Sequence, residues 1–143
     1  MIKASVDVDG IPKVQARMTA MQARGLTFQP VFSRARDQLE RANRANFASS
    51  GFLVGGWQRR KDAYSWPLMR RTGRLFNSLA NLRGPANVIT PKYAQFGTNV
   101  DYAKFHQYGT RDMPKRAILF NPRRFGEEVA SDAASWVVRG DFL

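Results

Sequence analysis

The strongest constraint on the fold is an apolar stripe that repeats at helical spacing from about Pro30 onwards. Apolar side chains recur every three or four residues, while arginines occupy the other faces. We expect this helix to end near Ser49-Ser50-Gly51, and Asp37 and Glu40 are spaced to pair with neighbouring arginines. The stripe consists of Val31, Phe32, Ala35, Leu39, Ala42 and Phe47.

Further elements are expected near both ends of the chain. Residues 2–8 alternate apolar and polar side chains, which predicts a strand. Between Pro12 and Gly25 apolar residues again recur at helical spacing, which predicts a helix that starts and stops near these two residues. A last helix should begin at Asn121-Pro122. Its inner face should carry Phe125, Val129, Ala133, Trp136 and Val137.

The middle of the chain predicts shorter elements and long loops. Residues 51–71 contain three glycines and two tryptophans, and we interpret them as one long basic-aromatic loop. A short helix should follow Thr72-Gly73. The order of elements predicts one α+β domain over residues 1–143, with a small antiparallel or mixed sheet packed against two to four helices and with long loops. The remaining short elements are strands at 88–90, 93–97 and 117–120 and a helical turn at 102–108.

The charge of the chain indicates an anionic partner. The 143 residues carry a net charge of +12, from 23 Lys+Arg against 11 Asp+Glu. Such an excess favours nucleic acid, an anionic membrane or an acidic protein surface. Positive charge gathers at 59–83 and 111–124, whereas the residues from Glu127 onwards are acidic on balance, so copies of the chain can meet head to tail. No apolar run approaches the roughly 20 residues that a membrane helix needs, so no membrane partner is expected.

The sequence contains no recognisable catalytic arrangement. His106 is the only histidine, and neither Asp101 nor Asp112 lies at a spacing that places a carboxylate beside it. Cysteine is absent, and no glycine pattern for phosphate binding appears. We therefore expect no metal, no cofactor and no enzymatic activity. The disfavoured alternative is a small basic nuclease, which predicts that His106→Ala abolishes cleavage.

The segment at 57–74 is the strongest candidate site, because basic side chains are interleaved with Trp57, Tyr64 and Trp66. Three interpretations remain open. The segment can follow a phosphate backbone and stack on bases, it can be a solvated loop anchored by its tryptophans, or it can be a protein interface. The predicted contacts with DNA or an acidic partner are Arg59, Arg60, Lys61, Arg70, Arg71 and Arg74.

A second candidate site follows at 102–116. Tyr102, Phe105 and Tyr108 lie three residues apart on one side of the expected helical turn, where they either fill the core or make contacts. A Met-Pro-Lys-Arg turn follows, and we expect Lys115 and Arg116 to point into solvent.

Three segments carry a family resemblance. LMRRTGRLFNSL at 68–79 is similar to a pattern of Leu, a Thr/Ser-Gly step, Leu, and Ser followed by an aliphatic residue. FGTNVDYAKFHQYGT at 96–110 is similar to a Gly-Thr-Asn, Tyr-Ala, His-Gln-x-Gly core. MPKRAILF at 113–120 is similar to a Pro-x-Arg-Pro-Phe/Ile-Leu run, with Ala117 where proline is frequent. In this order the segments resemble the phage virion morphogenesis family, the Mu-like tail-completion proteins.

The resemblance implies a structural virion protein of a tailed bacteriophage that acts in head-tail joining or tail completion. Such a subunit would form a homo-oligomeric ring, a hexamer or dodecamer, around the DNA channel at the head-tail junction. It would be assembled in the host bacterial cytoplasm and would contact connector, neck and tail-tube proteins, and packaged DNA. The alternative, from charge alone, is a stand-alone basic nucleic-acid-binding protein. The implied subunit or ring-ring interface comprises Trp57, Trp66, Tyr102, Phe105, His106, Gln107, Tyr108, Met113, Lys115 and Arg116.

Overall fold

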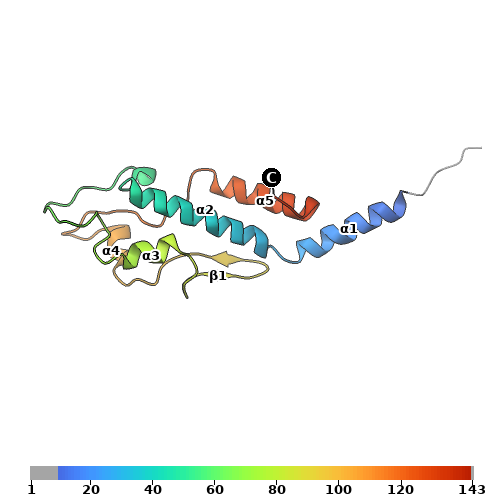
Figure 1. The fold of residues 1–143 in the computed structure, drawn as a ribbon, viewed down its shortest axis with the longest axis horizontal. Helices are drawn as coiled ribbons and strands as arrows, with labels where there is room; N and C mark the ends of the chain where they lie inside the picture. The colour runs from blue at the N-terminus through green and yellow to red at the C-terminus, as the bar shows by residue number, and fades with distance from the viewer. Residues whose placement is uncertain (1–9, 143) are drawn as a thin grey trace, which may run out of the picture.

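The long helix predicted from the apolar stripe runs through the body of the molecule. The computed structural model describes residues 10–142, so the strand predicted at 2–8 lies outside the described residues. Helix α2 spans Gln29–Ala48, close to the predicted bounds, and buries Val31, Ala35 and Phe47. Helix α5 (Phe125–Arg139) lies along one side of α2, and α3 (Arg74–Ala80), α4 (Ala103–Tyr108) and the strands lie on the other side (Figure 1).

Helix α5 spans Phe125–Arg139 and begins a few residues after the predicted start at Asn121-Pro122. Arg124 precedes it in a left-handed conformation, with φ of 63°. The predicted inner face is only half-buried, and the most buried side chains of α5 are polar. One of them, Asp132, accepts a hydrogen bond from Arg34 Nε at 2.8 Å, which joins α5 to α2 by charge as well as by apolar contact.

Helix α1 spans Ile11–Gly25, as predicted, but its apolar stripe is not buried. None of its residues is buried, and Val14 and Met18 are 56% and 57% exposed. The helix projects away from the body as an arm (Figure 1). Its C-terminal end is fixed to the body, because Trp136 Nε1 of α5 donates to Thr27 O at 2.9 Å just after the helix.

The shorter elements confirm the α+β class. After α2 come a 3₁₀ turn, η1, and helix α3; two strands then form an antiparallel hairpin that contacts α2, and helix α4 follows. Within residues 10–142 the sheet is limited to this hairpin, which pairs Val88 with Gln95. The bounds are Phe52–Val54 for η1, Arg74–Ala80 for α3, Val88–Ile89 for β1, Ala94–Gln95 for β2 and Ala103–Tyr108 for α4.

The strand predicted at 117–120 is wrong. The backbone there has no ladder partner, because a side chain from α4 replaces one. Gln107 Oε1 accepts from Ile118 N at 2.9 Å and from Leu119 N at 2.8 Å, and Gln107 Nε2 donates to Leu119 O at 3.0 Å. The amide of Gln107 therefore satisfies this extended segment and holds it against α4.

Trp57, predicted as an interface residue, lies in the core and is only 6% exposed. Its ring packs edge-on against Phe47 with the ring centroids 5.1 Å apart, and its Nε1 donates to Ala117 O at 2.8 Å. A Cβ on Gly51, where φ is 83°, would lie 2.3 Å from Trp57 Cδ1, so this position requires glycine. The core cluster comprises Phe47, Trp57, Leu75, Leu79, Val100, Ala103 and Ile118.

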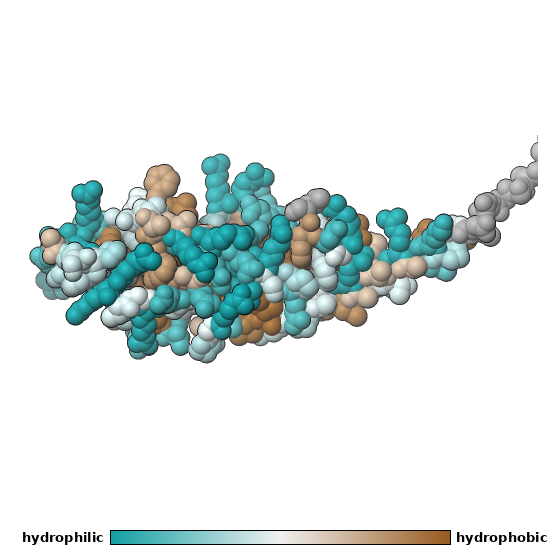
Figure 2. All heavy atoms as spheres, viewed as in Figure 1, coloured by the Kyte–Doolittle hydropathy of each residue, from teal (hydrophilic) through white to brown (hydrophobic). Residues whose placement is uncertain are grey.

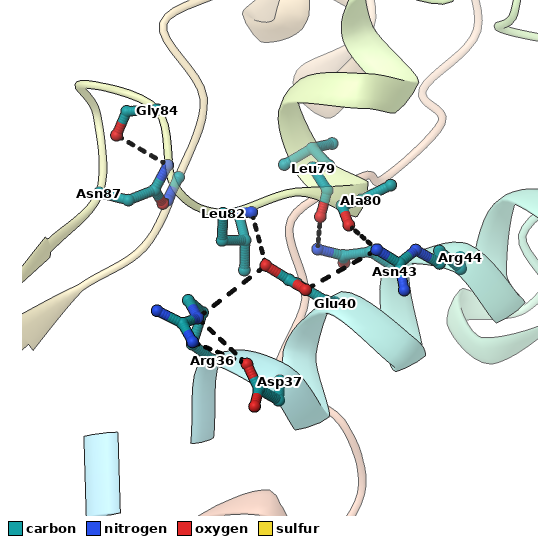
Figure 3. Close-up of polar contacts among 11 residues, drawn as sticks. Arg36, Asp37, Glu40, Asn43, Arg44, Leu79, Ala80, Leu82, Gly84 and Asn87 are labelled. Carbon is teal, nitrogen blue, oxygen red and sulfur yellow. Dashed lines mark hydrogen bonds and ion pairs between the residues drawn. The ribbon is translucent and has the colours of Figure 1, made fainter. Parts of the chain in front are cut away.

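A buried carboxylate on α2 fixes the end of α3 (Figure 3). Glu40 is 7% exposed and accepts a hydrogen bond from Leu82 N at 2.9 Å. Arg36 and Arg44 lie one helical turn before and after it, with closest N–O distances to its carboxylate of 4.0 and 3.7 Å. Beside it, Asn43 Nδ2 donates to Leu79 O at 2.8 Å, so the carbonyls left unpaired at the C-terminus of α3 are bound by α2.

We predict that Glu40→Ala lowers the free energy of unfolding by about 2–4 kcal/mol, because it leaves Leu82 N unpaired and two arginines without their shared carboxylate. Urea unfolding followed by circular dichroism measures this change. The control Asp112→Ala removes an exposed carboxylate outside any helix and should cost less than about 0.5 kcal/mol. Equal losses for the two variants would contradict the assigned role of Glu40.

Candidate functional site, an arginine-lined cavity

The two candidate segments of the sequence meet at one cavity of about 500 Å³. The loop after η1 and the start of α3 supply one wall, and α4 with the segment after it supplies the other. The lining residues are Arg60, Trp66, Leu68, Met69, Arg71, Thr72, Gly73, Leu75, Tyr102, His106 and Arg116.

Positive charge in this lining has no acidic counterpart among the described residues, because three arginines line the cavity and no described Asp or Glu does. Arg116 was expected in solvent but is 6% exposed, and its Nε donates to Gln58 O at 2.9 Å. Burial lowers the pKa of Arg116 below its ordinary value, and the nearby charge of Arg60 lowers it further. An oxyanion entering the cavity would relieve this repulsion, so the cavity is suited to a carboxylate or phosphate.

Aromatic rings hold the arginines of the loop in place. Tyr64 and Trp66 stack with their ring centroids 4.6 Å apart. The guanidinium carbon of Arg60 lies 5.3 Å from the Tyr64 centroid, and that of Arg71 lies 5.6 Å from the Trp66 centroid. Arg60 Nη2 also donates to Trp66 O. These contacts hold the guanidinium groups of Arg60 and Arg71 against the loop but do not neutralise their charge.

His106 brings an unsatisfied nitrogen to the same cavity. Its Nδ1 is buried and has no hydrogen-bond partner among the described residues, while its backbone oxygen accepts from Arg116 N at 2.7 Å. Burial, and then the charge of Arg116, lower the pKa of His106 below its ordinary value of 6.5. The ring is therefore neutral at physiological pH. Neither Asp101 nor Asp112 lines the cavity, so no carboxylate orients this histidine there.

The structure separates the other predicted site residues from the cavity. Arg70 packs over the ring of Phe76, with 3.7 Å between the guanidinium carbon and the ring centroid. Phe105 and Tyr108 lie on the exposed side of α4, at 46% and 78% exposure, rather than in the core. Arg59 lines a neighbouring cavity beneath the same loop. The remaining predicted residues outside the lining are Trp57, Lys61, Arg74, Gln107, Met113 and Lys115.

Sequence reasoning missed the apolar part of the lining. Leu68, Met69 and Leu75 had no functional role assigned, although all three fall within the 68–79 segment that carries part of the family resemblance. Met69 has a positive φ of 65°, which a sequence pattern does not reveal.

Comparisons of the chain with protein-family models, with curated proteins and with solved structures find no match. Within residues 10–142, no helix combines the length and apolar composition needed to cross a membrane. In that same part of the chain, no three His, Asp or Glu side chains are grouped so that they could hold a metal ion.

We predict that His106 makes the protein less stable in mild acid. Its folded pKa lies below 6.5, so as the pH falls below that value the unfolded chain takes up the proton first. The contribution of the neutral His106 side chain to the free energy of unfolding is complete above pH 6.5. It is lost as the pH falls through 6.5 towards the lowered pKa of the folded state. The free energy of unfolding, measured by urea at about pH 8 and about pH 5.5, should fall less between these two pH values for His106→Gln than for the wild type. Identical losses would contradict the burial of a neutral imidazole.

Proposed function

We propose that this chain is a structural, ring-forming subunit of the neck or tail terminus of a tailed bacteriophage, acting in head-tail joining or tail completion. The proposal is carried by the packing of the three segments that resemble virion morphogenesis proteins. Leu79, Ala103 and Ile118, one from each segment, belong to the same core cluster. Ser78 Oγ and Thr98 Oγ1 are also hydrogen-bonded at 2.8 Å. The three segments that carry the resemblance therefore pack against one another in the fold.

The cavity gives this subunit a way to hold an acidic group of a neighbouring protein. Arginine, tryptophan and tyrosine are the residues that most often anchor protein interfaces, and Arg60, Trp66 and Tyr102 are all present here. Arg116 is too deeply buried to meet a convex surface. A side chain inserted from a partner reaches such a recessed charge better than the backbone of a duplex does.

The second candidate, a stand-alone nucleic-acid-binding protein, is favoured by the exposed cations outside the cavity. Arg59, Lys61 and Arg74 are exposed on the same loop and the start of α3, in a chain with a net charge of +12. Such charges can follow a phosphate backbone without any inserted group.

Mass measured by light scattering at low and at high salt, with negative-stain imaging of the same sample, tests the proposal. We expect a closed ring whose mass gives a defined subunit number, with only weak binding of a short DNA duplex. A monomer that binds the duplex tightly, with affinity falling steeply as salt rises, would contradict the ring subunit and support the second candidate.

Charge variants separate the two candidates further. If exposed cations bind DNA, the double variant Arg59→Gln, Lys61→Gln should flatten the dependence of log affinity on log salt by about 0.9 per lost phosphate contact. For a ring subunit, we expect the same variant to leave the assembled mass unchanged. The control Arg41→Gln removes an exposed cation on α2, outside this loop.

A further inference from the structure

The apolar face of the arm formed by α1 is largely exposed rather than packed against another described element of the chain. It contributes no buried residue, and Ile11, Val14 and Met18 expose at least half of their surface on one face. In Figure 2, hydrophobic residues lie at the surface of the arm among hydrophilic ones. A helix of 15 residues is marginally stable in water without packing. The arm therefore needs a surface to lie against.

The body carries an uncovered apolar groove of about 450 Å³. It runs between α2, the end of α3, and the start of α5, and no charged residue of the described part of the chain lines it, although the chain carries a net charge of +12. Leu119, on its surface, is 43% exposed. A concave apolar surface of this kind is typical of a binding site. Its main apolar residues are Leu39, Leu82, Phe96, Leu119, Phe120 and Phe125.

The arm and the groove of one chain cannot meet. The arm is attached at the C-terminal end of α5, where Arg24 Nε donates to Val137 O at 2.9 Å and Trp136 Nε1 donates to Thr27 O. The groove lies at the opposite end of α5, beside Phe125. A 15-residue helix separates these ends by roughly 20 Å, and the arm points away from the body (Figure 1).

We propose that the α1 arm of one copy lies in the apolar groove of a second copy, with its apolar stripe covering the groove. Charge favours this occupant. The arm carries Lys13, Arg17 and Arg24 and no acidic residue, and Arg24 is bound to α5 of its own chain. The first turn of α5, next to the groove, carries exposed Glu127 and Glu128. Glu127 already pairs with Arg124 at 2.9 Å, so Glu128 is the acid left for a cation of the arm.

This contact has a consequence for symmetry. The arm and the groove are different surfaces, so copies joined through them are related head to tail. Such heterologous contacts close into a ring when the rotation per copy permits, and otherwise they form an open filament. The inference rests on the proposed ring-forming function and identifies the contact that would build the ring.

Met18→Glu tests the contact by placing a carboxylate in the apolar stripe. We expect the wild type to assemble and the variant to remain monomeric, with the dissociation constant between copies raised at least about tenfold. The matched control is Ala16→Glu, which adds the same charge on the opposite, exposed face of the arm and should assemble as the wild type does. Circular dichroism of all three checks that the body stays folded.

Leu119→Glu should block the groove in the same way. A 1:1 mixture of Met18→Glu and Leu119→Glu should then form a dimer and stop, because only one intact arm and one intact groove remain to pair.

An arm that instead pairs with another arm would leave Leu119→Glu fully assembled, which would overturn the proposal. So would full assembly of Met18→Glu, or a wild type that stays monomeric at high concentration. The ring function itself fails only if that monomer also binds duplex DNA tightly and with steep salt dependence.

Discussion

The buried carboxylate of Glu40 is the constraint on which both surfaces of the body depend. It binds Leu82 N, just beyond the C-terminus of α3, and so fixes how α3 lies on α2. Leu75 of α3 lines the arginine-lined cavity, while Leu79 and Leu82 line the apolar groove. One short helix therefore separates a cationic site from an apolar one, and its position is held by polar contacts to α2.

The three surfaces differ in ways that suit assembly. The cavity places the positive charges of Arg60 and Arg116 close enough to repel each other. The groove is uncharged, and the arm presents apolar side chains between cations. Because the arm and the groove lie at different ends of α5, the proposed contact between copies would occupy both in the same copy and leave the cavity accessible.

Local patterns predicted what depends on local structure. The stripe from Val31 to Phe47 and the stop at Gly25 gave correct helices, because helical periodicity is set by neighbours in the chain. Prediction from the sequence failed where contacts between residues far apart in the chain determine the local structure. The amide of Gln107 replaces a strand partner for Ile118, and the buried Arg116 binds Gln58 O in the distant 57–74 segment. For the same reason the sequence suggested two separate candidate sites, whereas residues of both line the same cavity, and it did not reveal that the stripe of α1 is exposed.

The absence of cysteine from the chain allows one direct measurement of how copies meet. A double variant, Val14→Cys and Leu119→Cys, places one thiol on the arm and one in the groove. After mild oxidation, we expect a ladder of covalent multimers on a denaturing gel, ending at the mass of the closed ring, while each single variant gives no ladder. A double variant that assembles to its full mass yet yields no cross-links between copies would contradict an account in which the arm joins one subunit to the next.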